Sequence, residues 1–156
     1  MYVLNMKLKP TKTQVIVFAA VAGIVAVICI ACMIKQQSKA PASATCDEVG
    51  EYSLCAESIA EQCDFAKQFG LTVDAENRQS VEITVPSDFS EVYEEYNELQ
   101  NKIGLDLRGY KGKTVDMVTY PLENCDEKLV LLVYKGAVIG GHITNGEYGE
   151  ENKPLI

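Results

Sequence analysis

Hydrophobic positions in this chain form one unbroken run near its beginning and several short periodic segments after it. The run covers residues 15–34 and contains no charged side chain. A helix of that length rises about 30 Å, which matches the hydrocarbon core of a bilayer. The run also lacks a polar face at a helical period, unlike a helix buried in a soluble domain. We therefore predict a transmembrane helix over residues 15–34, in contact with membrane lipid.

The periodic segments after residue 45 predict two helices. Ser58 and Glu61 have the spacing of a capping box, so the first helix begins there. The second helix is clearer, because Asp88 or Ser90 caps its start and Gly104 closes it. Its apolar side recurs every three or four positions and consists of Phe89, Val92, Tyr93, Tyr96, Leu99 and Ile103.

Five segments have the composition or alternation of strands, namely 71–73, 80–85, 114–122, 128–134 and 137–144. A turn at residues 135–136 joins the last two into a hairpin. Within that hairpin, Gly140 and Gly141 indicate a bulge or a close backbone approach. The chain after Asn145 is polar, and we expect it to be frayed.

The order helix, two strands, helix, three strands predicts an α+β domain. Short connections and the final hairpin favour a mostly antiparallel sheet with both helices packed on one face. The chain then divides into a basic cytoplasmic head at 1–14, the transmembrane helix at 15–34, a flexible linker at 35–45 and an extracytoplasmic α+β domain at 46–156. The linker is assigned because its residues are small and polar and include a proline.

Charge is divided sharply between the two ends of the chain. From Thr45 onward there are nine Lys and Arg against 22 Asp and Glu, a formal charge of −13, and no acid precedes Asp47. Three of the five lysines before Thr45 precede the apolar run. The positive-inside rule therefore places the N-terminus in the cytoplasm and the C-terminal domain outside the cell membrane. Because an acidic surface repels phosphates, we expect no nucleic-acid partner.

Two processing signals compete with an uncleaved anchor. Residues 42–44 have the small-x-small form of a signal-peptide cleavage site, and a lipoprotein signal would end at Cys32. The apolar run exceeds the roughly 7–15 residues usual in a signal peptide. Cys29 stands where a lipoprotein signal is expected to have an aliphatic residue. We favour the anchor, and all three alternatives place the domain outside the cytoplasm.

Four cysteines lie outside the apolar run, at Cys46, Cys55, Cys63 and Cys125. They allow three pairings, and we expect them to be free or only partly paired. We place Cys55 and Cys63 on one helix, about 12 Å apart, which is too far for a disulfide. The domain has no Cys-x-x-Cys and no Cys/His pair at ligand spacing, so we expect no metal and no cofactor.

A candidate interaction surface combines the outer face of the second predicted helix with the loop that follows it. Its members are Glu91, Glu94, Glu95 and Glu98 on the helix and Arg108 and Tyr110 in the loop. The carboxylates lack the spacing and the glycine of a calcium loop, and a merely solvated helix face is the alternative. The alternative for Tyr110 is a place at the border of the core with one hydrogen bond.

No catalytic constellation stands out, and we expect a protein that is not an enzyme. The alternative is an extracellular hydrolase in which His142, the only histidine, acts as base for Ser87, Ser90 or Cys125. A further alternative is an accessory subunit of a membrane complex, because small residues between positions 19 and 26 permit close helix packing.

Four stretches of the chain resemble an uncharacterised bacterial family, domain of unknown function 4830. They are FGLTVD at 69–74, TVPSDFSEVYEEYNELQ at 84–100, GLDLRGYKGKTV at 104–115 and LLVYKGAVIGG at 131–141. The resemblance covers residues 58–144. It implies one domain behind a membrane segment or lipoprotein signal, mainly in Gram-positive bacteria, with no established activity. Leu71 departs from the family, which commonly has tryptophan after Phe-Gly, and the four cysteines look peculiar to this chain.

Residues and resemblance together predict a membrane-tethered, extracytoplasmic interaction or ligand-sensing domain. Its partner would be an unknown protein or a small ligand.

Overall fold

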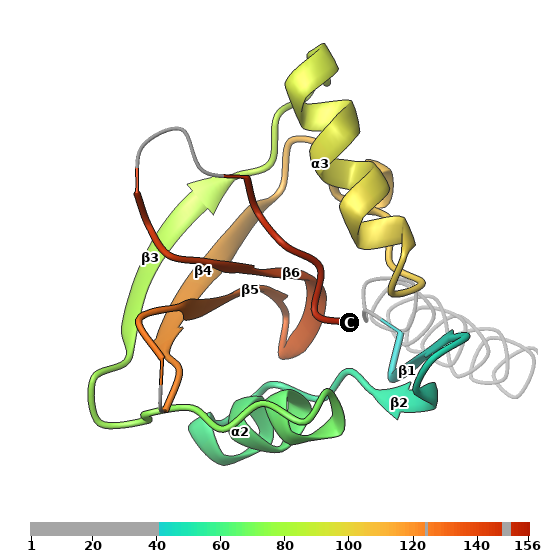
Figure 1. Ribbon diagram of the computed structural model, residues 1–156. Helices are drawn as coiled ribbons and strands as arrows, with labels where there is room; N and C mark the ends of the chain where they lie inside the picture. The colour runs from blue at the N-terminus through green and yellow to red at the C-terminus, as the bar shows by residue number, and fades with distance from the viewer. Residues whose placement is uncertain (1–40, 124, 148–150) are drawn as a thin grey trace, which may run out of the picture. The chain divides into compact units, whose positions relative to one another are not determined.

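A four-stranded antiparallel sheet forms the centre of the computed structural model, which describes residues 41–123, 125–147 and 151–156 (Figure 1). Its strands lie side by side in sequence order and are β3 Gln79–Thr84, β4 Thr114–Pro121, β5 Lys128–Tyr134 and β6 Ala137–Thr144. The predicted turn between β5 and β6 is confirmed, with positive φ at Lys135 and Gly136.

The predicted basic head, the predicted transmembrane helix and most of the predicted linker lie outside the described residues. Within the part of the chain that the structure describes, no helix has the length and apolar composition needed to cross a membrane.

Both predicted helices of the domain are present. The helical elements are α2 Ile59–Gln68, α3 Glu91–Asn101 and the 3-10 helix η1 Leu107–Tyr110. The capping box of α2 is confirmed, because Ser58 Oγ accepts a hydrogen bond from the Glu61 N–H and Glu61 Oε2 accepts one from the Ser58 N–H. α3 begins after Ser90, whose hydroxyl accepts a hydrogen bond from the Tyr93 N–H at 3.4 Å.

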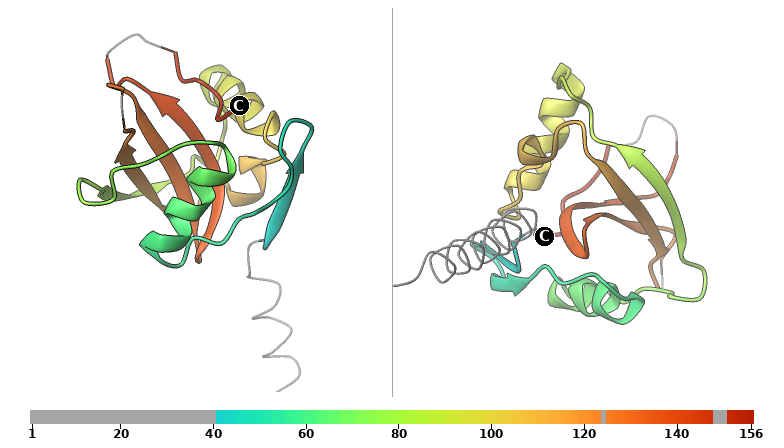
Figure 2. Two further views of the ribbon diagram at one scale, coloured as in Figure 1. Left: turned by 60° about the horizontal axis from the view of Figure 1, so that its bottom comes forward. Right: turned by 180° about the vertical axis from the view of Figure 1, so that it is seen from behind.

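The two helices pack on opposite faces of the sheet, which corrects the prediction that both share one face (Figure 2). Side chains alternate between the two faces along a strand. On β5, Leu131 belongs to the cluster that contains Phe65 of α2. The next residue, Leu132, belongs to the cluster against which Tyr93 and Tyr96 of α3 pack. Because β5 is apolar at successive positions, both of its faces require cover, and one helix serves each face.

A hairpin that the sequence analysis missed precedes α2. β1, Ser43–Cys46, pairs antiparallel with β2, Gly50–Ser53. Residues 43–45 therefore belong to a strand, which corrects the prediction that the flexible linker extends to residue 45. The physical reason is packing: Tyr52 is 3% exposed, and its hydroxyl donates a hydrogen bond to the Ile103 carbonyl just beyond α3.

The outer edge of β6 is covered by three other parts of the chain. The bonds run from Val138 N–H to the Leu54 carbonyl (2.8 Å), from Gly141 N–H to Gln100 Oε1 (2.7 Å) and from Ile143 N–H to the Lys153 carbonyl (2.9 Å). Leu155, beyond the last of these, is 4% exposed and joins the core. The prediction of a frayed tail is therefore wrong for residues 151–156, because this segment adds both backbone pairing and an apolar side chain.

Two smaller predictions are also corrected. The segment 71–73 forms only an isolated bridge, at Val73. The chain turns directly after it, where the Asp74 carboxylate accepts hydrogen bonds from the N–H groups of Glu76 and Asn77. Cys55 lies before α2, in an isolated bridge to β6, so Cys55 and Cys63 do not share a helix. All four cysteines of the described domain are free.

Candidate functional site

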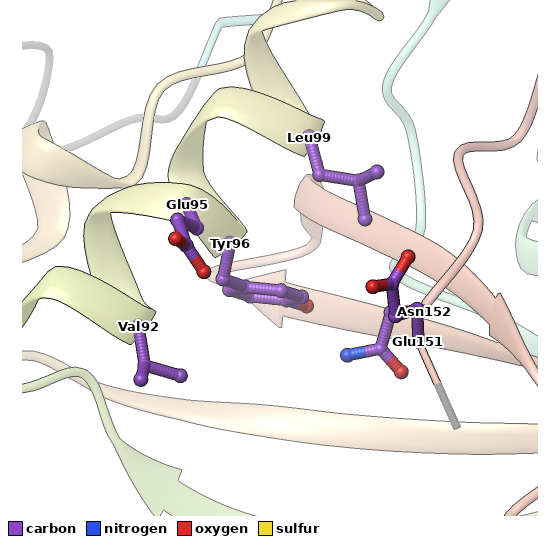
Figure 3. Close-up of a pocket in the computed structure, with 6 residues that line it drawn as sticks. All are labelled: Val92, Glu95, Tyr96, Leu99, Glu151 and Asn152. Atoms are coloured by element: carbon purple, nitrogen blue, oxygen red, sulfur yellow. The ribbon is translucent and has the colours of Figure 1, made fainter. Parts of the chain in front are cut away.

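A cavity of about 480 Å³ opens between α3 and the C-terminal segment 151–156 (Figure 3). It is lined by Val92, Glu95, Tyr96, Leu99, Glu151 and Asn152. The four residues from α3 occupy positions i, i+3, i+4 and i+7, so they stand on one side of the helix. Val92 is 74% exposed. Apolar and acidic groups thus share one cavity wall, an arrangement that suits a ligand with an apolar body and a positive charge.

Tyr96 links this cavity to β6. Its hydroxyl lies 2.9 Å from Nδ1 of His142, and the two rings meet edge to face with centroids 5.4 Å apart. His142 is 9% exposed, and burial lowers its pKa to about 4 because a poorly solvated site disfavours the charged imidazolium. Burial also raises the pKa of Tyr96. Both groups are therefore neutral near pH 7, and their bond holds the middle of α3 to the sheet.

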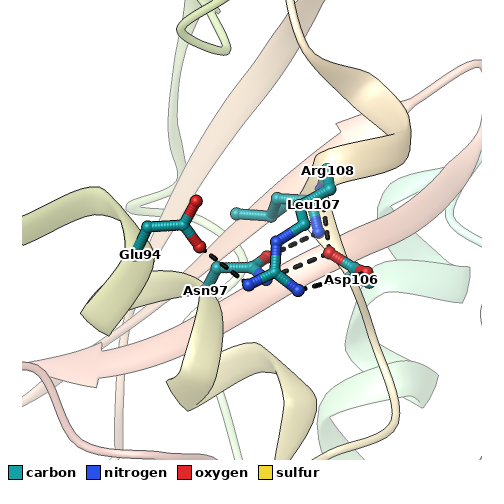
Figure 4. A network of polar contacts seen from close by, with 5 residues as sticks. All are labelled: Glu94, Asn97, Asp106, Leu107 and Arg108. Carbon is teal, nitrogen blue, oxygen red and sulfur yellow. Dashed lines mark hydrogen bonds and ion pairs between the residues drawn. The ribbon is translucent and has the colours of Figure 1, made fainter. Parts of the chain in front are cut away.

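A second polar network joins α3 to η1 (Figure 4). The fully buried Asn97 accepts a hydrogen bond from the Leu107 N–H at 2.7 Å and donates one to Asp106 Oδ1 at 3.0 Å. Asp106 Oδ1 also accepts a hydrogen bond from the Arg108 N–H, which is the largest cause of the lowered pKa of Asp106. Arg108 Nη2 lies 2.7 Å from Oε2 of Glu94, which belongs to α3. These contacts fix the loop after α3.

The structure brings together three residues of the predicted interaction surface. The pKa of Arg108 is raised chiefly by its hydrogen bond with Glu94, and also by the charges of Asp106 and Glu98. Glu94, Glu98 and Arg108 therefore form one exposed charged cluster, in which Arg108 and Glu94 make an ion pair. Its role in binding a partner stays a prediction.

The other members of that predicted surface lie elsewhere. Glu95 lines the cavity, and Glu91 stands in the first turn of α3, where the helix dipole favours a carboxylate. Tyr110 is half-buried against Tyr134, with ring centroids 5.6 Å apart, and burial raises its pKa. Tyr110 therefore lies at the border of the core, which was the alternative to a role in the interaction surface.

The hydrolase alternative depends on a nucleophile next to His142. Among the described residues, the hydrogen bond recorded for His142 is with Tyr96, and none joins it to a serine or a cysteine. Ser90 caps α3 through its hydroxyl. These contacts assign His142 and Ser90 to the packing and capping of α3, and the hydrolase alternative stays a prediction.

Sequence reasoning missed the side of the cavity that comes from the C-terminal segment. Glu151 and Asn152 were assigned to a frayed tail, whereas pairing at residue 153 brings them beside α3. The available signal was the apolar pair Leu155 and Ile156, which ends an otherwise polar stretch.

Comparison with known proteins gives one family. The family model Domain of unknown function (DUF4830) matches residues 65–143, about half of the chain. The chain belongs to the DUF4830 family. No curated protein and no solved structure matches it. The matched range runs from α2 to β6, so the α3 wall of the cavity lies inside the DUF4830 match and Glu151 and Asn152 lie outside it.

Proposed function

We propose that this DUF4830 protein is a membrane-tethered binding domain that holds a small cationic ligand in the cavity between α3 and the C-terminal segment. The observation that carries the proposal is Val92, which is 74% exposed at a cavity that Tyr96 and Leu99 also line. Covering a valine side chain that is otherwise in water contributes about 1.5 kcal/mol to binding. Tyr93 and Tyr96 pack against the core cluster of the sheet, whereas Val92 stays exposed and is available to a ligand.

The charges around the cavity support a positively charged ligand. Glu95 and Glu151 contribute two carboxylates to its lining, and Asn152 adds an amide that can orient a polar group. The formal charge of −13 from Thr45 onward attracts cations and raises their local concentration. An amine with an apolar tail combines both requirements.

The uncharged run at 15–34 supports tethering, and the distribution of lysines around it supports a domain held outside the cytoplasm. A tether would hold the domain on the outer side of the membrane.

Methyl NMR of the full-length protein in detergent tests the cavity. Hexylamine should shift the methyl signals of Val92 and Leu99, and hexanol, which lacks the charge, should shift them less. Val92→Lys places a positive charge at the cavity and should abolish the shift at Leu99. Val81→Lys is the matched control, because Val81 is also an exposed apolar residue, at 51%, but lies on β3. Equal responses in both variants would contradict the cavity as the binding site.

Cysteine labelling tests the location. Cys55 and Cys125 are exposed, whereas Cys46 is buried. A membrane-impermeant maleimide, applied to intact cells with a mild reductant, should label the wild-type chain strongly and the Cys55→Ser/Cys125→Ser variant weakly. Labelling that appears only after lysis would place the domain in the cytoplasm.

A further inference from the structure

The two edge strands of the sheet differ in whether other segments pair with their outer sides. Three segments cover β6, whereas the outer edge of β3 has no backbone partner among the residues that the structure describes. Five of the six β3 residues are exposed. An uncovered edge strand is a ready template for another extended chain.

The register of β3 shows which backbone groups are available. Val85, just after β3, donates its N–H to the Lys113 carbonyl at 2.9 Å, and its carbonyl accepts from the Gly112 N–H at 2.8 Å. The backbone N–H and carbonyl of Val85 therefore point toward β4. Along an antiparallel strand, the backbone groups of successive residues point alternately toward one neighbouring strand and toward the other. The continuous pairing of β3 with β4 carries this alternation back along the strand. The groups that point outward belong to Ser80, Glu82 and Thr84.

The side chains along this edge are acidic on one face and apolar on the other. Glu82 lies directly opposite Asp116 of β4, and both residues are exposed. Like charges placed directly opposite one another destabilise a strand pair. On the other face, Val81 is 51% exposed and lies opposite Met117. A strand added beside β3 would place one side chain next to Glu82 on the acidic face and another next to Val81 on the apolar face.

We propose that β3 is a docking edge for an extended peptide segment that alternates basic and apolar residues. The basic residue neutralises the Glu82–Asp116 pair, and the apolar residue covers Val81. Charge favours such a segment over a second copy of this chain, because two domains of charge −13 repel one another. This edge is separate from the α3 cavity, so it goes beyond the proposed amine ligand.

Amide hydrogen exchange of the full-length protein in a neutral detergent tests the proposal. The probe is a short capped peptide of alternating lysine and valine. It should slow exchange at the outward-facing amides of Ser80, Glu82 and Thr84. The amides of Val81 and Ile83 face β4 and serve as internal controls. The same peptide N-methylated at every residue keeps its side chains but has no N–H donor on either edge, and it should give no protection.

Two substitutions at Glu82 separate backbone pairing from charge. Glu82→Pro removes one outward N–H without removing a bond to β4, and it should weaken binding at least about tenfold. Glu82→Gln keeps the N–H and should weaken binding about two- to fivefold, as expected for an exposed charge pair. Unchanged exchange at Val81 and Ile83 shows that the Glu82→Pro variant is folded. If that variant unfolds, the N-methylated peptide still decides the question.

Several results would overturn the proposal. One is equal binding of a glutamate–valine peptide, which would show that charge does not select the partner. Another is protection that N-methylation of the peptide leaves intact. Protection that appears at high protein concentration without peptide would assign the edge to a second copy of the chain.

Discussion

The Tyr96 hydroxyl and Nδ1 of His142 lie 2.9 Å apart and connect the cavity side of α3 to β6. One partner lines the cavity, and the other is a buried, titratable side chain on the covered edge of the sheet. A change in the charge of His142 therefore acts on the wall of the proposed binding site.

The first prediction concerns pH. The pKa of His142 is about 4 in the folded protein against 6.5 without burial, so the unfolded chain takes up the proton first as pH falls. The contribution of neutral His142 is fully present above about pH 6.5 and is lost as pH falls toward 4. The difference in pKa corresponds to about 3 kcal/mol in the free energy of unfolding. Urea unfolding followed by near-ultraviolet circular dichroism, measured across this range, checks it.

His142→Asn is the control for that prediction, because asparagine keeps a polar atom near the position of Nδ1 and does not titrate. The variant should show a flatter dependence of unfolding free energy on pH between 6.5 and 4. Identical slopes in wild type and variant would rule out His142 as the source.

The second prediction compares two glycines of positive φ. Gly104 has φ of +78°, and a Cβ there would overlap the Thr45 carbonyl oxygen of β1. Gly70 has φ of +71°, and a Cβ there would meet no atom within 4 Å. Gly70→Ala should cost about 1–2 kcal/mol for the left-handed backbone alone. Gly104→Ala should cost about 1–3 kcal/mol more, because β1 must also move.

Urea unfolding of both glycine variants gives the comparison. Equal losses in the free energy of unfolding would mean that β1 does not pack closely against residue 104 in solution.

The third prediction concerns Asn97, which is fully buried and accepts the Leu107 N–H. Asn97→Ala leaves that buried donor without its acceptor and should lower the free energy of unfolding by about 1–3 kcal/mol. Asn101→Ala is the matched control, since Asn101 is exposed at the end of the same helix. Similar stabilities of the two variants in urea would show that the loop does not depend on Asn97.

The fourth prediction concerns the ion pair between Arg108 and Glu94. Both side chains are well exposed, so water and salt screen their attraction. Arg108→Ala should change the free energy of unfolding by less than about 1 kcal/mol. The Arg108→Ala variant would then lose a partner that binds this cluster while its domain stays folded. In-cell crosslinking of the intact chain can detect this loss. A larger loss of stability would assign Arg108 to the fold rather than to an exposed interaction surface.

Local elements followed from the sequence because their signals lie within a few residues. The Ser58–Glu61 capping box started α2, and the alternation of residues 80–85 marked β3. The turn at residues 135–136 depends on two adjacent residues of positive φ. β1 and β2 carried no such signal, because their four-residue strands are held by the burial of Tyr52 rather than by a strong pattern.

The sequence by itself determined the two helices, the strands of the main sheet and the acidic character of the domain, all of which depend on residue type and short spacing. Only the tertiary structure decided which face each helix covers, which sheet edge is unpaired among the described residues and how the cavity is assembled. Glu151 lies beside α3, and His142 contacts Tyr96, because segments far apart in the chain pair with one another. Such contacts depend on how apolar surface is shared among all the elements, and no local spacing encodes that.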